Sequence, residues 1–297
     1  MEVILDALKD TALVFPFILI IYMLIELMEN GRAASKSRRA LQGPLAPLLG
    51  AATGLVPQCG FSVMAAKLYD KGLIRTGTIM AVFLATSDEA LILLLGHSST
   101  NAHAAQSILP LVLIKLFVAV IVGYTVNALV PENIERVPLV HAEGGEAYVY
   151  SCGHSHENKS TVNLYIVEPL LHTLKVTAFI LMVNLIFGFV IDAVGEETIA
   201  KGLIGGTYFE PFISAAVGLI PNCASSVVIT ETYVMGGIKF GSCIAGLCTN
   251  AGLGLVVLLK NTKKIKRNIL LVLSLYAVSV IVGIVINVIC AAAGIGV

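Results

Sequence analysis

The chain has 297 residues, of which 57% are hydrophobic and only 13% charged, with a mean hydropathy of +0.90 and a formal net charge of zero. So small a charged share excludes an ordinary soluble domain. A neutral chain without a basic face also gives no reason to expect a nucleic-acid partner. The composition therefore predicts a multi-pass membrane protein whose main partner is the lipid bilayer.

Apolar runs that approach or exceed the roughly twenty residues needed to span a bilayer recur along the chain. They cover residues 11–25, 76–87, 116–131, 176–191, 240–259 and 269–297. The predicted spanning helices are 11–28, 76–96, 107–130, 168–192, 240–259 and 269–293. No basic region of a signal peptide precedes the first run, so we expect the first helix to be retained.

Two short segments place a proline, an amide and a cysteine inside an apolar stretch, at Leu55–Ser62 and again at Leu219–Ser226. Proline removes a backbone donor and clashes with the preceding turn, so a helix should break near Pro57 and near Pro221. The sequence therefore predicts two broken-helix hairpins, at residues 44–70 and 208–235.

The two motifs belong to a longer internal repeat. Residues 47–81 align with 211–245, and fourteen of these thirty-five positions are identical. Further on, the run Val118–Gly123 with Asn127 matches Val278–Gly283 with Asn287. We therefore expect two copies, at 1–130 and 165–297, joined by a polar linker at 131–164.

The distribution of Lys and Arg indicates how the hairpins are placed in the membrane. If both are re-entrant, fourteen of these residues lie on one side and two on the other, whereas full crossing gives ten against six. The positive-inside rule favours re-entrant hairpins, six full crossings and a cytoplasmic linker. Because each copy then crosses three times, the copies must be inverted. The predicted fold is all-α: two inverted repeats, each of three spanning helices plus one re-entrant hairpin, as in many secondary transporters.

The predicted substrate site lies where the broken helices meet. Cys59 and Cys223 directly follow the breaks, at the start of each second half-helix, where unpaired amides and the helix dipole favour the thiolate. Thiolates are ligands for soft metals. Neighbouring amides and hydroxyls complete the predicted substrate-binding set: Gln58, Asn222, Ser62, Ser226 and Asn250.

Charged residues within predicted spanning helices are further candidates. Asp88 and Glu89 are costly to bury in a membrane and indicate an ion or proton site, unless they lie near enough to the interface to be solvated. Lys115 and Lys175 could pair with an acid, but we expect them to snorkel to the surface. Thiolates and carboxylates together suit a transition metal or metalloid. The expected ligands are Cys59, Cys223, Asp88 and Glu89.

The polar linker contains a weaker candidate metal site, formed by Cys152, His154 and His156 downstream of His141. This spacing is not that of a zinc finger, although thiolate and imidazole groups this dense could hold a metal loosely. The alternative is a solvated linker with incidental histidines. No role is expected for His97, His103 and His172. The chain has no Cys-x-x-Cys pair, which argues against thiol–disulfide chemistry.

The duplicated tips Pro-Gln-Cys-Gly-Phe-Ser and Pro-Asn-Cys-Ala-Ser-Ser, the segment Ala-Thr-Ser-Asp-Glu-Ala and the His-containing central loop resemble the ten-helix heavy-metal exporter family. That family is described variously as arsenic efflux or manganese transport proteins, and is similar in outline to the organoarsenical permeases. The resemblance covers nearly the whole chain, and four half-helices plus six spanning helices give ten. It implies efflux of a metal or metalloid, with Cys59, Cys223, Asp88 and Glu89 in the site.

Three functions follow as hypotheses. The first is a secondary transporter of the cytoplasmic membrane that exports a transition-metal ion or a thiol-reactive metalloid in exchange for protons, with Asp88 or Glu89 as the proton-coupling group. No phosphate-binding Gly-rich motif is present that would indicate ATP as the driving force, and no cofactor is expected. The second is a carrier of a small organic or oxyanion substrate bound at half-helix N-termini.

The third hypothesis is a membrane-embedded enzyme with Cys59 as nucleophile, which lacks a histidine base within reach. The sequence leaves open the identity of the small inorganic substrate, the coupling ion and the oligomeric state, a homo-oligomer included.

Overall fold

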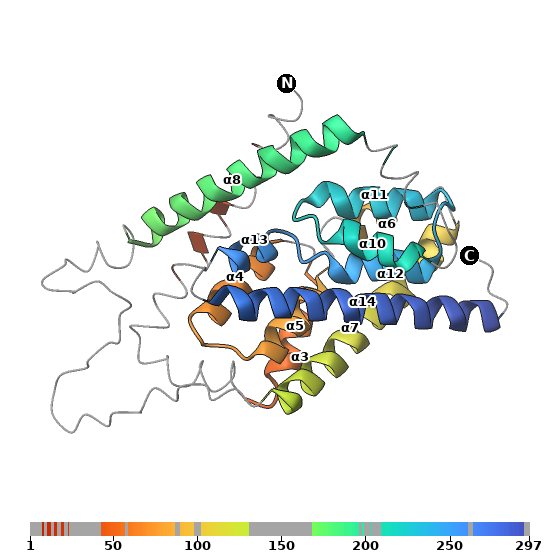
Figure 1. The fold of residues 1–297 in the computed structure, drawn as a ribbon, viewed down its shortest axis with the longest axis horizontal. Coiled ribbons are helices and arrows are strands. Elements are labelled where there is room, and N and C mark those ends of the chain that lie inside the picture. The colour runs from red at the N-terminus through yellow and green to blue at the C-terminus, as the bar shows by residue number, and fades with distance from the viewer. Residues whose placement is uncertain are drawn as a thin grey trace, which may run out of the picture.

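The computed structural model describes residues 43–56, 59–86, 90–97, 102–130, 168–195, 209–260 and 264–293, together with separate positions between 8 and 23 and residues 198 and 203. Within these residues every regular element is an α-helix (Figure 1). The predictions that fall outside them concern the linker residues His141, Cys152, His154 and His156, and also Pro57, Gln58, Asp88 and Glu89.

The helices follow the chain in two similar series. The first series contains α3 (Ala46–Gly54), α4 (Cys59–Asp70), α5 (Thr76–Ala85), α6 (Ala90–His97) and α7 (Ala102–Leu129). After α8 (Glu168–Val194), the second series contains α10 (Glu210–Gly218), α11 (Cys223–Val234), α12 (Phe240–Thr249), α13 (Leu253–Leu259) and α14 (Ile265–Ala292). Helix α7 begins at Ala102, five residues before the predicted start.

Several helices are long and apolar enough to cross a membrane. Among the described residues these are Thr76–His97 taken as one unit, Ala105–Leu129 and Ile265–Ala292, with a fourth span if α12 and α13 are counted as one helix bent by 42°. On α7, apolar side chains of the exposed face recur every four residues: Leu109, Leu113, Phe117 and Ile121. Such a continuous exposed apolar stripe suits a surface that faces lipid, so the protein is a multi-pass membrane protein.

Both hairpin breaks lie where the sequence predicts them. Helix α3 ends at Gly54 and α4 begins at Cys59, while α10 ends at Gly218 and α11 begins at Cys223. The second break contains Pro221, which has no amide hydrogen to continue the helix. Each cysteine therefore stands at the first position of a helix, as expected.

The predicted spanning helices at 76–96 and 240–259 are long and apolar enough to cross a membrane, but each contains a second kind of break. Helix α5 ends at Ala85, and Thr86 has a non-helical ψ of 130°. Helix α12 ends at Thr249 and α13 begins only at Leu253. Between them Gly252 has a φ of +54°, which glycine adopts far more readily than other residues, and its amide donates to Asn250 Oδ1 at 2.9 Å. Polar residues and one glycine thus replace proline at these breaks.

Equivalent helices make equivalent contacts in the two series. Helix α5 packs between α3 and α7, and α12 packs between α10 and α14. The amide of Gly77 donates to Asn127 Oδ1 at 2.9 Å, and the amide of Gly241 donates to Asn287 Oδ1 at the same distance. The repetition in the sequence is therefore accompanied by the same glycine–asparagine hydrogen bond in each series.

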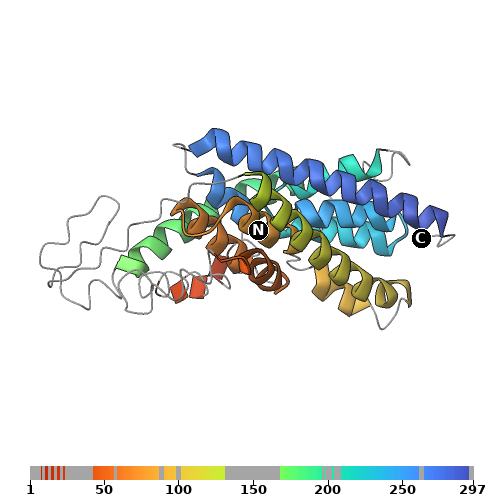
Figure 2. The ribbon, with the colours of Figure 1, turned by 90° about the horizontal axis from the view of Figure 1, so that it is seen from below.

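The two series also interlock. Helix α4 packs against α13, and α11 packs against α6 (Figure 1). The hydroxyl of Ser107, near the start of α7, is hydrogen-bonded to that of Tyr233, and the guanidinium of Arg267, near the start of α14, lies 4.3 Å from the ring centroid of Tyr69. Seen from below, the long helices α7 and α14 run along the body that these contacts hold together (Figure 2). The second helix of each hairpin therefore packs against a helix of the other series.

Candidate functional site

The two breaks of the second series lie against each other. The Asn250 amide nitrogen Nδ2, from the α12–α13 break, donates to Ser225 Oγ at 3.3 Å in the first turn of α11, and both residues are buried. Asn222 caps α11, since its Oδ1 accepts from the amide of Ala224 at 3.2 Å. Two predicted substrate-binding amides, Asn222 and Asn250, are thus brought to the same place in the fold.

Serine hydroxyls satisfy the backbone carbonyls around this junction. Ser225 Oγ donates to the carbonyl of Asn222 at 2.7 Å and lies 3.1 Å from that of Ile220. Ser226 Oγ, a predicted substrate ligand, donates to the carbonyl of Cys223 at 2.7 Å, so it retains only acceptor capacity for a substrate. Ser225 was not singled out from the sequence, because its importance depends on Asn250, twenty-five residues away.

The cysteines differ in accessibility. Cys223 is half-buried at the first position of α11, where the amides of the first turn have no partner inside the helix. Cys243 and Cys248 are fully buried on α12. Cys59 begins α4, and its side chain lies outside the described residues. Cys223 is therefore the candidate thiol that the structure places best for contact with a substrate.

The hairpin of the first series reaches the α12–α13 break of the second. Ser62, a predicted site residue on α4, is completely buried. It lies against Gly254 so closely that a Cβ on that glycine would stand 2.8 Å from Ser62 Cβ and 2.8 Å from its carbonyl oxygen. The N-terminal turn of α4 and the start of α13 are therefore in backbone contact.

Lys115 was expected to snorkel to the membrane surface, and this prediction is wrong. Its side chain is 0% exposed, and Nζ donates to the carbonyl of Thr86 and, at 2.8 Å, to that of Leu247. Lys115 lies midway along α7, about 20 Å from either end of that helix, which is beyond the reach of a lysine side chain. The ends of α5 and α12 instead supply it with buried acceptors. The side chain of Lys175 lies outside the described residues.

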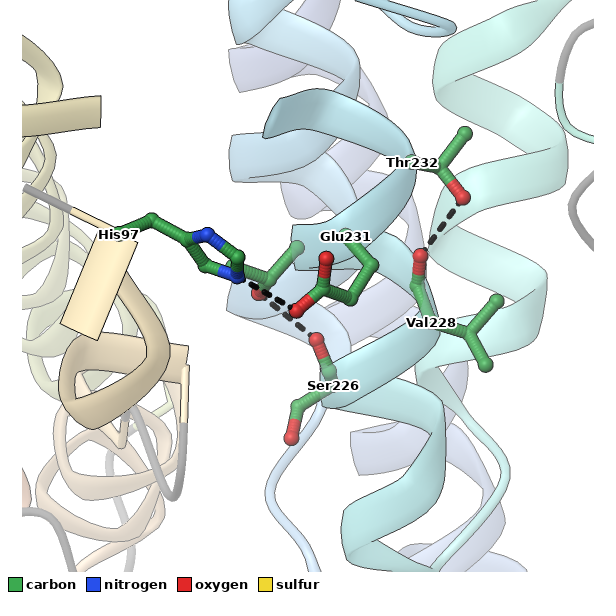
Figure 3. Close-up of polar contacts among 6 residues, drawn as sticks. His97, Ser226, Val228, Glu231 and Thr232 are labelled. Atoms are coloured by element: carbon green, nitrogen blue, oxygen red, sulfur yellow. Dashed lines mark hydrogen bonds and ion pairs between the residues drawn. The ribbon is translucent and has the colours of Figure 1, made fainter. Parts of the chain in front are cut away.

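A further polar contact between the series lies away from the breaks (Figure 3). His97 Nε2, at the end of α6, stands 2.8 Å from Glu231 Oε1 on α11, and the two side chains are 35% and 30% exposed. Glu231 is eight residues beyond Cys223, or about 12 Å along the helix. No pattern in the sequence predicts this pair, because nothing relates positions 97 and 231.

The predicted metal-binding set is not assembled within the described residues. No group of three or more His, Cys, Asp or Glu side chains that could hold a metal occurs in this part of the chain. The carboxylates of Asp88 and Glu89 and the side chain of Cys59 lie outside it. What the structure does place together is the buried Asn250 amide and the start of α11, where Asn222 is the N-cap and Cys223 the first residue.

Comparison with known proteins adds one finding to this geometry. A family model described as "Putative, 10TM heavy-metal exporter" matches residues 1–171 and 164–295. No curated protein and no solved structure matches the chain. Since the matched regions cover nearly all of the sequence, and the described residues form apolar helices, the chain belongs to this family of heavy-metal exporters.

Proposed function

We propose that this protein is a secondary transporter that exports a transition-metal ion or a thiol-reactive metalloid across the cytoplasmic membrane in exchange for protons. The observation that carries the proposal is the meeting of broken helices at Asn222, Ser225 and Asn250, with Cys223 at the adjoining helix start. Irregular backbone inside a membrane is tolerated only where protein or a cavity covers it, and in transporters it marks the binding site.

In this proposal the thiols of Cys59 and Cys223 bind the soft substrate, and the buried amides hold the break in place. A thiolate is favoured at a helix N-terminus, and it is the form that binds soft metals. Asp88 or Glu89 takes up the proton that drives substrate release. The family is one of exporters rather than enzymes, which argues against the membrane-embedded cysteine enzyme.

We further propose that the two series are inverted repeats with re-entrant hairpins. The reciprocal packing of α4 on α13 and of α11 on α6 supports a two-fold arrangement, and the uneven distribution of Lys and Arg supports the re-entrant form. Lys71 and Lys239 follow α4 and α11, and the proposal places them on opposite sides. An impermeant thiol reagent should label Lys71→Cys only from the cytoplasm and Lys239→Cys only from outside. Labelling of both from one side would contradict the inversion.

One observation favours a second candidate substrate class. The buried ammonium of Lys115 and the N-terminus of α11 both carry positive charge near the breaks, which suits an oxyanion or a small organic anion. In that case backbone amides rather than thiols would hold the substrate. The two candidates therefore differ in how much they depend on cysteine.

The experiment that tests the proposal measures uptake of arsenite, zinc and manganese into inside-out vesicles containing the full chain. Cys59→Ser and Cys223→Ser should each raise the half-saturating concentration at least about tenfold, because a hydroxyl is a much poorer soft-metal ligand. Cys290→Ser, at a half-buried cysteine near the end of α14, is the matched control and should change nothing. Full metal or metalloid export by the double serine variant would refute the thiolate site. Retained arsenate or organic-anion transport would then favour the second candidate.

A further inference from the structure

Lys115 makes hydrogen bonds to backbone carbonyls at two helix breaks. In a continuous helix the carbonyl of Leu247 would accept from the amide of Ala251, but that amide donates to Thr249 instead, at 3.0 Å. The carbonyl of Thr86 lies just beyond the end of α5. An ammonium group has three donors, and Lys115 directs donors to both of these carbonyls.

The charge of Lys115 also suits its position. The C-terminal end of a helix carries a partial negative charge, and a cation there is stabilising. Helix α5 ends at Ala85 and α12 at Thr249, so one ammonium is close to two such ends. A buried lysine is costly in a membrane unless it is paired in this way.

The second series has no equivalent of this lysine. In the alignment that pairs Gly123 with Gly283 and Asn127 with Asn287, the position of Lys115 is occupied by Leu275, which is also 0% exposed. Two breaks, one from each series, therefore share one lysine. The contact joins segments 29 and 132 residues away from it in the chain.

We propose that Lys115 is a positioning residue of the transport site. Its ammonium holds the end of α5 at Thr86 against the α12–α13 break, and so sets the spacing between Thr86 and Asn250. The inference rests on the proposed function, because it assigns the substrate to these breaks. Removal of the ammonium should loosen both breaks at once, although Lys115 belongs to neither.

The test combines hydrogen–deuterium exchange with transport, on the full chain in lipid nanodiscs and in vesicles. Lys115→Met keeps the length of the side chain but removes its donors. We expect it to accelerate amide exchange at least tenfold in peptides covering both breaks, near Thr86 and near Asn250. It should also raise the half-saturating concentration for arsenite or zinc more than tenfold. Lys115→Arg, which keeps charge and donors, should restore both measurements to within about threefold. Leu275→Met is the matched control at the aligned position and should behave as wild type.

A merely structural lysine would give a different pattern. Faster exchange confined to α7 or to one break, or an unchanged half-saturating concentration in folded Lys115→Met, would overturn the proposal. If Lys115→Met does not fold, the Lys115→Arg variant provides the test. A folded arginine variant with near-wild-type amide exchange at both breaks supports the proposal. Raised exchange at the breaks, or failure of the arginine variant to fold, overturns it. If wild type transports none of the tested substrates, the exporter function fails, but exchange at the two breaks still decides the role of Lys115.

Discussion

Replacing Gly254 with alanine would insert a methyl group into the contact between α13 and α4. The new Cβ would stand 2.8 Å from Ser62 Cβ, 2.8 Å from its carbonyl oxygen and 2.9 Å from its carbonyl carbon. Two of these atoms belong to the backbone, so no side-chain rotation relieves the overlap. The two helices would have to separate by about 0.5 Å, which forfeits about a quarter of the dispersion energy at the atoms affected.

The expected loss of stability is about 1–2 kcal/mol. Overpacking a well-packed contact costs about 1–3 kcal/mol. Alanine in place of glycine in a helix offsets about 0.5–1 kcal/mol of this, and less here because Gly254 is the second residue of α13. At roughly 2–4 °C per kcal/mol for a chain of 150–250 residues, the unfolding midpoint should fall by about 2–8 °C.

The fully buried thiols Cys243 and Cys248 offer a signal for unfolding, since a fluorogenic maleimide reaches them only when the protein opens. The chain contains no tryptophan, so thiol labelling replaces intrinsic tryptophan fluorescence. Gly96→Ala on α6 is the control, because a Cβ there meets nothing within 4 Å, and its midpoint should equal or slightly exceed that of wild type. A Gly254→Ala midpoint equal to that of the control would refute the backbone contact between α4 and α13.

Three further predictions concern charged and metal-binding groups. Of Asp88→Asn and Glu89→Gln, at least one should abolish export driven by a proton gradient while substrate binding remains measurable, and full gradient-driven export by both would exclude carboxylate coupling. A double-mutant cycle between His97→Gln and Glu231→Gln should give a coupling free energy of about 0.2–1 kcal/mol in the thermal assay, because both side chains are about one-third exposed; a coupling above about 2 kcal/mol would contradict this. Replacing the linker residues Cys152, His154 and His156 with alanine should raise the half-saturating concentration for transport and leave the maximal rate unchanged. An unchanged concentration dependence would instead favour a solvated linker.

The positions of the hairpin breaks could be predicted because their cause is local. Pro57 and Pro221 each remove a backbone donor, and this effect does not depend on the rest of the fold. The breaks after Ala85 and Thr249 were not predicted. Neither contains proline: the second is formed by Asn250 and Gly252, and a lysine remote in the chain donates to a carbonyl at each, so the apolar pattern alone predicted uninterrupted helices.

The environment of Lys115 in the candidate site could not be predicted from the sequence for a similar reason. Considered within one helix, a lysine among apolar residues is expected to extend towards the surface. Its position midway along α7 was a signal against that interpretation, since neither surface lies within reach. Its actual partners, the carbonyls of Thr86 and Leu247, become visible only when the two series are packed together. Ser225 and Glu231 were missed for the same reason.

The interlocked packing has a consequence for how the chain is made. The contact between Lys264 and the carbonyl of Asp70 joins residues 194 positions apart. At a synthesis rate of about 5–20 residues per second, the hairpin of the first series waits about 10–40 s for the helices on which it finally rests. During that interval α4 has inserted without α13, so its buried face at Ser62 does not yet pack against Gly254. Assembly in the membrane is therefore completed only after nearly the whole chain has left the ribosome.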